Sequence, residues 1–230
     1  MTQVGLPQSV AAGLDGIDIS NCQPPVDWAK VAAAGKRFVW CKLGGGPSPA
    51  HNTGLYVDNM FARHTQGARA AGLRVGAYFF GKPVGDPILQ ARFFVRNYVW
   101  KPGDLPPLLD LEVMDDLTPA QVVGWAMAFF TEADHMMGVS LAFYTYTSFL
   151  QQLAPHASDW WSDRVICQAQ YDGLAKAVAP FPAPRFLQYD GNEGVCPGVT
   201  GACDEDRFLG TADELAALCG DPNDPYDDVA

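Results

Sequence analysis

Two carboxylic acids stand two residues apart near the middle of the chain, in the run PPLLDLEV at 106–113. Alternate residues of a strand share one face, about 6.6 Å apart, so a strand over Pro107–Val113 would project Asp110 and Glu112 together. Repulsion and desolvation should then raise the pKa of one acid. A protonated acid beside an ionised one is what cleavage of a glycosidic bond requires. The alternative is a solvated strand end, in which Glu112 begins an acidic loop with Asp115 and Asp116.

Two further acids lie in the first and last predicted strands. Asp18 ends the strand predicted over Gly16–Ile19, and Asp204 lies in the strand predicted over Ala202–Phe208. In a closed eight-strand barrel these strands are neighbours, and the carboxyl ends of the strands form the face that holds the active site. The sequence therefore predicts four acids at one mouth: Asp18, Asp110, Glu112 and Asp204.

Tyrosines late in four predicted strands could line the same mouth as stacking platforms for sugar rings. They are Tyr78, Tyr144, Tyr171 and Tyr189. Taken singly, each fits a core or rim position better than a ligand contact. As a set at one end of the barrel, they favour a binding role.

The elements that must position these residues alternate regularly up to Tyr146. Predicted strands cover Gly16–Ile19, Arg37–Leu43, Arg74–Phe80, Pro107–Val113 and Val139–Tyr146, and predicted helices cover Val26–Ala34, Tyr56–Ala71, Ile88–Trp100 and Pro119–Met137. Glycines 35, 72 and 138 stand where left-handed helix C-caps are expected, and Thr118 with Pro119 is typical of a helix start. This alternation indicates parallel strands joined by crossover helices.

After Tyr146 the helices become short. A helix over Ser148–Leu153 precedes strands over Val165–Tyr171, Arg185–Tyr189 and Ala202–Phe208, and a helix over Thr211–Leu218 follows. About eight strands suffice to close a barrel whose interior is filled by side chains. The predicted class is an α/β, TIM-like barrel. A doubly wound open sheet is the alternative, but it would need a helix after each late strand.

Composition limits the partners. The 230 residues are 48% hydrophobic and 18% charged, with a net charge of −11, so the chain can bury a core and is repelled by nucleic acids and anionic membranes. We expect neither as a partner. The predicted organisation is an N-terminal extension over 1–14, one barrel domain over 15–219, and an acidic, proline-containing tail or linker stub over 220–230. The start lacks the pattern of a secretory signal.

Cysteine and histidine spacing gives no support for a metal site. There is no CxxC pair, and the four histidines are scattered, so we expect neither a metal nor a cofactor. Cys196 and Cys203 flank the turn-rich PGVTGA and could close a loop disulfide. The alternative is that both are small buried thiols.

From about Gly16 to Phe208 the sequence resembles family 25 of the glycoside hydrolases, the Chalaropsis-type lysozymes. The resemblance is carried, in order, by GIDIS at 16–20 with Gln23 and Asp27-Trp28, FVWCK at 38–42, AGLRVGAYFF at 71–80, LDLE at 109–112, Tyr144-Thr145, Gln170-Tyr171, Gln188-Tyr189, and Asp204 with Phe208. It implies an irregular barrel of five β/α units and three further strands, (β/α)5(β)3. It also implies hydrolysis of the β-1,4 bond between N-acetylmuramic acid and N-acetylglucosamine in bacterial peptidoglycan, by a monomer without a cofactor.

Carried over to this chain, the resemblance implies that Glu112 is the general acid/base and Asp110 the neighbour that stabilises the intermediate. Asp18 and Asp204 match the other site acids, and Gln188 joins the four tyrosines as a substrate contact. The N-acetyl carbonyl of the substrate would attack the anomeric carbon with retention of configuration; direct attack by a carboxylate is the alternative. Leu108 occupies a position that is Asp in the chitinase signature DxxDxDxE, which argues against that family.

The chain departs from the family pattern in places. Where the family often has Lys-Ala-Thr-Glu-Gly, the chain reads KLGGG at 42–46 and lacks the acid. Cys167 and Leu187 replace tryptophans that typically precede the late tyrosines. Two other functions therefore stay open: a glycan-binding barrel with weak turnover, and a glycosidase acting on another N-acetylated polymer such as chitin. The expected place of action is the bacterial wall, outside the cell, for a phage endolysin or for a secreted enzyme whose leader has been removed.

Overall fold

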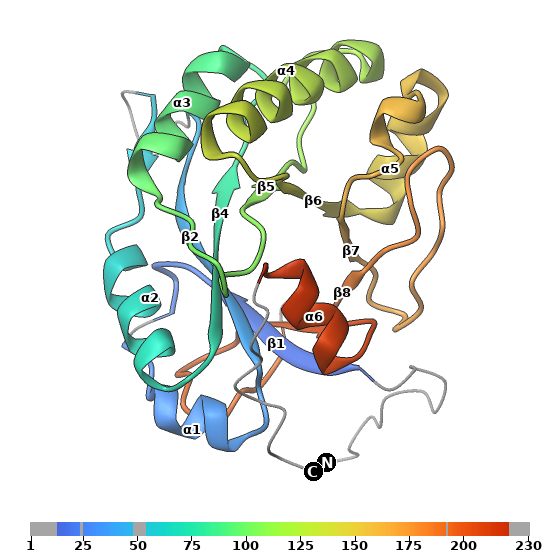
Figure 1. The fold of residues 1–230 in the computed structure, drawn as a ribbon. Helices are drawn as coiled ribbons and strands as arrows, with labels where there is room; N and C mark the ends of the chain where they lie inside the picture. The colour runs from blue at the N-terminus through green and yellow to red at the C-terminus, as the bar shows by residue number, and fades with distance from the viewer. Residues whose placement is uncertain (1–12, 24, 48–53, 192, 221–230) are drawn as a thin grey trace.

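The computed structural model describes residues 13–23, 25–47, 54–191 and 193–220 (Figure 1). Nearly all of the predicted extension over 1–14 and tail over 220–230 falls outside these residues. Eight strands form a closed barrel, because β1 pairs with β2 on one side and with β9 on the other. Their bounds are β1 Leu14–Ile19, β2 Phe38–Gly45, β4 Arg74–Phe80, β5 Leu108–Asp110, β6 Ala142–Tyr146, β7 Ile166–Ala169, β8 Phe186–Asp190 and β9 Asp204–Phe208.

Helices follow the first five barrel strands and lie outside the barrel (Figure 1). They are α1 Trp28–Ala33, α2 Phe61–Ala70, α3 Pro87–Asn97, α4 Pro119–Met137 and α5 Thr147–Leu153; the 3-10 turns η1 Ala154–His156 and η2 Asp159–Trp161 and the last helix, α6 Ala212–Leu218, complete the list. The predicted (β/α)5(β)3 barrel is confirmed. None of the helices in the described ranges is long and apolar enough to cross a membrane.

Local signals fix the ends of these helices as the sequence predicts. Thr118 caps α4 through a capping box with Gln121, and Pro119 occupies the first turn. Gly35, Gly72 and Gly138 have φ values of 87°, 84° and 69°, in the left-handed region that glycine adopts without strain. These caps end each helix where the chain must turn back toward the barrel.

Several predicted elements differ from the structure in their bounds, and two of these differences bear on the site. The helix predicted from Tyr56 begins at Phe61, and Tyr56–Val57 instead forms β3, which pairs with the end of β2. The strand predicted over Pro107–Val113 is regular only over Leu108–Asp110. One further hydrogen bond, from Leu111 N to Tyr144 O at 3.0 Å, continues the pairing before the chain leaves the sheet. Glu112 therefore stands just beyond the strand.

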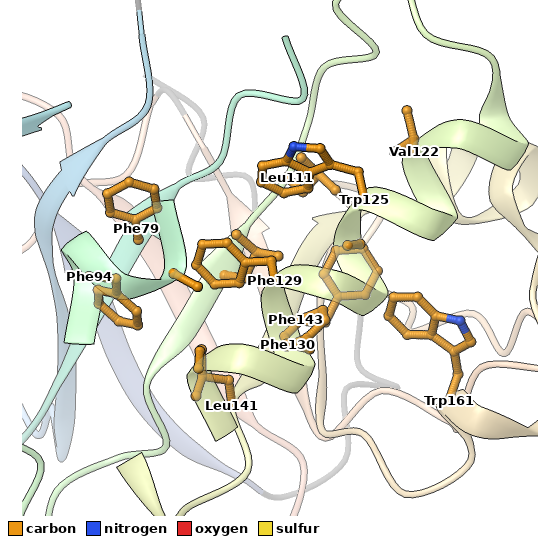
Figure 2. Packing of buried hydrophobic residues seen from close by; sticks show 14 of the residues in the cluster. Phe79, Phe94, Leu111, Val122, Trp125, Phe129, Phe130, Leu141, Phe143 and Trp161 are labelled. Atoms are coloured by element: carbon orange, nitrogen blue, oxygen red, sulfur yellow. The ribbon is translucent and has the colours of Figure 1, made fainter. Parts of the chain in front are cut away.

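The described residues form three hydrophobic clusters, two of which frame the site. Figure 2 shows aromatic side chains packed between α4 and the sheet, among them Phe79, Phe129 and Phe143, all fully buried. Inside the barrel, Trp40 and Phe186 pack edge to face, with ring centroids 4.6 Å apart. The interior cluster also includes residues of α6, so this helix covers one end of the barrel. A ligand must therefore enter from the other end.

Candidate active site

The open end of the barrel holds a cavity of about 160 Å³. Five carboxylic acids line it: Asp18, Asp110, Glu112, Asp204 and Asp206. All four acids predicted from the sequence are among them. The strand that carries Asp204 runs in a different direction from the one expected. β9 is antiparallel to both of its neighbours. Asp204 begins β9 and reaches the mouth from the amino end of that strand rather than from its carboxyl end.

Asp110 and Glu112 are in direct contact. The two carboxyl groups share a hydrogen bond, in which Asp110 is the donor. Asp110 is only 6% exposed, and burial followed by the charge of Glu112 raises its pKa well above the usual range. Burial also raises the pKa of Glu112, while the bond from Asp110 and the charge of Lys42 act in the opposite direction. The pair therefore keeps one proton, held mainly on Asp110 in the free protein.

The residues beside this pair anchor it in the core. Leu109 and Leu111 are fully buried in the outer aromatic cluster, as alternation along a strand predicts. Alternation over the predicted strand would place Val113 in the same cluster. Val113 is instead half-buried and belongs to none of the core clusters of the described residues. The reason is that the strand has already ended, so alternation no longer sets the direction of the side chain.

Asp18 and Asp204 form a second acid pair. They are directly opposed across β1 and β9, and Asp204 donates a hydrogen bond to Asp18. Burial is the main cause that raises the pKa of Asp18 to about 6 and that of Asp204 to about 8. The charge of Asp18 adds to the rise at Asp204, whereas at Asp18 the charge of Glu112 raises the pKa and the hydrogen bonds from Gln188 and Asp204 lower it. This pair also keeps one proton near neutral pH, held on Asp204.

Gln188 connects the acids to the tyrosines. Its Nε2 donates to Asp18 Oδ2 at 2.8 Å, and its Oε1 accepts from the hydroxyls of Tyr144 and Tyr171, each at 2.9 Å. Tyr78 and Tyr144 line the cavity. Tyr171 lies at the rim and is 58% exposed. Gln188 thus fixes one wall of the cavity and the orientation of Asp18.

Tyr189 does not reach the cavity. Its hydroxyl donates to Glu205 Oε2 at 2.7 Å, and the Arg207 guanidinium lies 5.3 Å from its ring centroid. Neighbouring residues of a strand point to opposite faces, so a strand that turns Gln188 inward turns Tyr189 outward. The expected placement of Tyr189 in the mouth is therefore wrong.

Two cavity residues were missed by the sequence analysis. Asp206 is 4% exposed, and burial together with the charges of Asp18 and Asp204 raises its pKa well above the usual range. It stands two residues after Asp204, so the alternation that joined Asp110 to Glu112 could have found it. Lys42 is the cation of the cavity lining, with Nζ 5.0 Å from the ring centroid of Phe80.

The glycines that replace the family acid have a structural reason. A Cβ atom on Gly44 would lie 1.9 Å from the carbonyl oxygen of Tyr56, and one on Gly45 would lie 3.1 Å from the Tyr56 ring. The short strand β3 therefore occupies the space in which a side chain would stand. Of the two replaced tryptophan positions, Cys167 lines the cavity and Leu187 is buried outside it.

The described residues offer no arrangement suited to a metal ion. No group of three or more His, Cys, Asp or Glu side chains among them is placed to hold one. Cys196 and Cys203 are free buried thiols in the structure, in hydrogen-bond contact with each other. The chemistry that this site supports is proton transfer and electrostatic stabilisation by carboxyl groups.

Comparisons with known proteins agree on one family. The model of glycosyl hydrolases family 25 matches residues 17–199. Lysozyme M1 of Streptomyces globisporus is 28% identical over 233 residues, covering 90% of this chain and 71% of that protein. The N,O-diacetylmuramidase of Chalaropsis sp. is 31% identical over 163 residues, covering 65% of this chain and 68% of that one. The crystal structure of the lysozyme from Streptomyces coelicolor superposes with a TM-score of 0.82 at 27% identity, over 91% of this chain and 98% of that one.

Proposed function

Because this chain belongs to family 25 of the glycosyl hydrolases, we propose that it is a lysozyme, an N-acetylmuramidase of bacterial peptidoglycan. It hydrolyses the β-1,4 bond between N-acetylmuramic acid and N-acetylglucosamine. The observation that carries the proposal is the buried Asp110–Glu112 pair, which shares a proton at the open end of the barrel. A buried acid pair of this kind supplies the neutral acid that bond cleavage requires.

In the proposed reaction, Glu112 is the general acid and then the general base. Substrate binding draws the shared proton from Asp110 to Glu112 along their hydrogen bond, as the N–H of the N-acetyl group donates to Asp110. Glu112 gives the proton to the glycosidic oxygen while that oxygen leaves the anomeric carbon. The N-acetyl carbonyl oxygen attacks the same carbon and forms an oxazolinium, whose positive charge Asp110 stabilises. Glu112 then takes a proton from water while the water oxygen attacks the anomeric carbon. This attack opens the oxazolinium ring and restores the N-acetyl group, and the configuration at the anomeric carbon is retained overall.

The contact between the two acids favours this route over direct attack by Asp110. A carboxylate nucleophile and its acid partner stand about 5–5.5 Å apart, with the anomeric carbon between them. Asp110 and Glu112 are instead close enough to share a hydrogen bond, which is nearer than that separation. Asp110 is therefore better placed to hold the N-acetyl group than to attack the sugar.

The second acid pair has a supporting role in the proposal. Asp18 and Asp204 position the water and add negative potential beside the oxazolinium. The hydroxyls of Tyr78 and Tyr144 and the exposed ring of Tyr171 contact the sugar. Gln188 fixes the positions of Tyr144, Tyr171 and Asp18 through its three hydrogen bonds.

We also propose that the protein acts as a monomer on the cell wall, outside the cytoplasm. Every residue that has a role in the proposed reaction belongs to this chain, so the reaction as proposed needs no second copy. The net charge of −11 disfavours nucleic acids and anionic membranes as partners.

The test is fragment analysis of digested peptidoglycan. New reducing ends are reduced with borohydride and identified by mass spectrometry, and we expect muramitol. Glu112→Gln should lower the rate at least about 100-fold, whereas Glu193→Gln, an exposed acid outside the cavity, should match the wild type. Glucosaminitol ends, cleavage of chitin oligomers alone, or equal rates for Glu112→Gln and the wild type would refute the proposal. An inverted anomer as first product would refute the mechanism.

A further inference from the structure

The segment that joins β5 to α4 carries Glu112 and has a strained backbone. Asp115 and Asp116 have φ values of 45° and 66°, so two consecutive residues with side chains adopt the left-handed region. This region is unfavourable for most residues with side chains, although aspartate and asparagine enter it more readily than others. Two such residues in succession are uncommon, and contacts from outside the segment help to hold them.

Lys82 provides such a contact. Its Nζ lies 2.6 Å from Asp115 Oδ1, and the two side chains are 16% and 18% exposed. An ion pair so shielded from water is screened less than a surface pair, and it therefore holds its geometry more strongly. The contact joins the segment after β5 to the segment after β4.

Lys82 is itself held by Gln90 of α3. The Gln90 side chain accepts from Lys82 N at 3.0 Å and donates to Lys82 O at 2.7 Å, and it is 1% exposed. Gly46 and Gly85 pack directly against it, since a Cβ on either would lie within 2.7 Å of the Gln90 amide. The lysine backbone is thus fixed before its side chain reaches Asp115.

Glu112 lies between two anchored points. Upstream, Leu111 N donates to Tyr144 O at 3.0 Å; downstream, Asp115 is bound to Lys82. We infer that the Lys82–Asp115 ion pair is a positioning contact, which holds the left-handed turn and thereby places the Glu112 carboxyl over the glycosidic oxygen. The inference rests on the proposed function, because it assigns a position to the proposed general acid.

Asp115→Asn removes the charge while keeping the size and the backbone preference of the side chain. Asparagine is nearly the same size and tolerates the left-handed region, so only the ion pair is lost. We expect kcat on a soluble glycan fragment to fall at least about 10-fold with KM within about 2-fold, because a displaced catalytic group affects the transition state more than binding. Asp116→Asn is the matched control: it has the same backbone geometry, is exposed, and should keep kcat within about 2-fold.

A second variant tests whether the two residues act together. Lys82→Met should lower kcat as much as Asp115→Asn, and the double variant should be no worse than either, because one contact is lost in all three. Losses that multiply in the double variant would overturn the inference. So would equal kcat values for Asp115→Asn and Asp116→Asn.

Amide hydrogen exchange of residues 112–117 separates this inference from the proposed function. We expect faster exchange in Asp115→Asn than in the wild type or in Asp116→Asn. If the wild type fails to cleave peptidoglycan, the proposed function is wrong, and the exchange comparison still decides whether the ion pair holds the segment. Unchanged exchange in Asp115→Asn would overturn the inference whatever the activity.

Discussion

Replacing Asp18 with asparagine should make the protein more stable while it damages the site. Burial raises the pKa of Asp18 from 3.8 to about 6, so the folded protein holds this proton more tightly than the unfolded chain does. Stability is therefore lost as the pH rises from about 4 to about 6, and the loss is complete above about pH 7. Asparagine keeps the shape of the side chain and an oxygen that can accept from Gln188, but it has no proton to lose.

The magnitude follows from the two pKa values. The interval from 3.8 to about 6 corresponds to about 3 kcal/mol, at about 1.4 kcal/mol per pH unit. Asp18→Asn should therefore gain about 3 kcal/mol over the wild type between pH 3 and pH 8. For a chain of this length, that equals a relative rise in Tm of roughly 6–12 °C.

Thermal unfolding followed by circular dichroism at pH 3, 5, 7 and 8 measures this difference. The gain should appear between pH 4 and pH 6 and stay constant above pH 7. Hydrolysis of peptidoglycan should fall in the same variant, because the pair with Asp204 is broken. A Tm difference that does not change with pH would refute the reasoning, since the burial of an ionised Asp18 would then cost nothing.

Two further predictions concern the surroundings of that pair. Asp206→Asn should leave kcat within about 2-fold near neutral pH, because burial raises the pKa of Asp206 well above its usual range and so favours the neutral form that asparagine mimics. A pH–rate profile displaced by a full pH unit would contradict this. Gln188→Ala should lower stability by roughly 2–4 kcal/mol at pH 7 in thermal unfolding, because three hydrogen bonds are lost and Asp18 loses its donor; a loss below about 1 kcal/mol would contradict this role.

The β/α rhythm and the first acid pair could be predicted from local pattern. Glycine C-caps and the Thr118 capping box depend on neighbouring residues alone, and the structure places them as the sequence indicates. Asp110 and Glu112 meet although β5 ends at Asp110. The bond from Leu111 to Tyr144 keeps the backbone extended for one more residue, which is all that their spacing requires.

The direction of β9 could not be predicted in the same way. No local pattern distinguishes a parallel from an antiparallel strand, because side chains alternate in both. The connection between β8 and β9, residues 191–203, has the dozen residues that a crossover needs, and its described part forms no helix. The connection between the parallel strands β7 and β8 forms no helix either, so a missing helix does not reveal the strand direction. Tyr189 and Asp206 could have been placed by alternation along their strands. Tyr189 follows the inward-facing Gln188 and so points outward, and Asp206 stands two residues after Asp204 and so points into the cavity.

The glycines of β2 show why a family pattern does not transfer position by position. Gly44 lies in a run of three glycines, a pattern typical of a flexible loop. In the structure, the carbonyl of Tyr56 lies where a side chain at this position would be. The pairing of β3 with β2 brings Tyr56 there, and it joins residues that are separated by a loop. A missing acid here therefore reflects the local course of the chain rather than the loss of the catalytic pairs.

The arrangement of charges connects stability to chemistry. Five acids line the cavity with Lys42 as the cation among the lining residues, so ionising all of them would leave a large uncompensated charge in a largely buried space. The lower-energy state retains protons: one in each acid pair and one on Asp206. The proton of the Asp110–Glu112 pair is the one that the proposed general acid must hold at neutral pH. The burial that destabilises the ionised carboxylates therefore also keeps the catalytic acid neutral, and stabilising substitutions within the two acid pairs should lower activity.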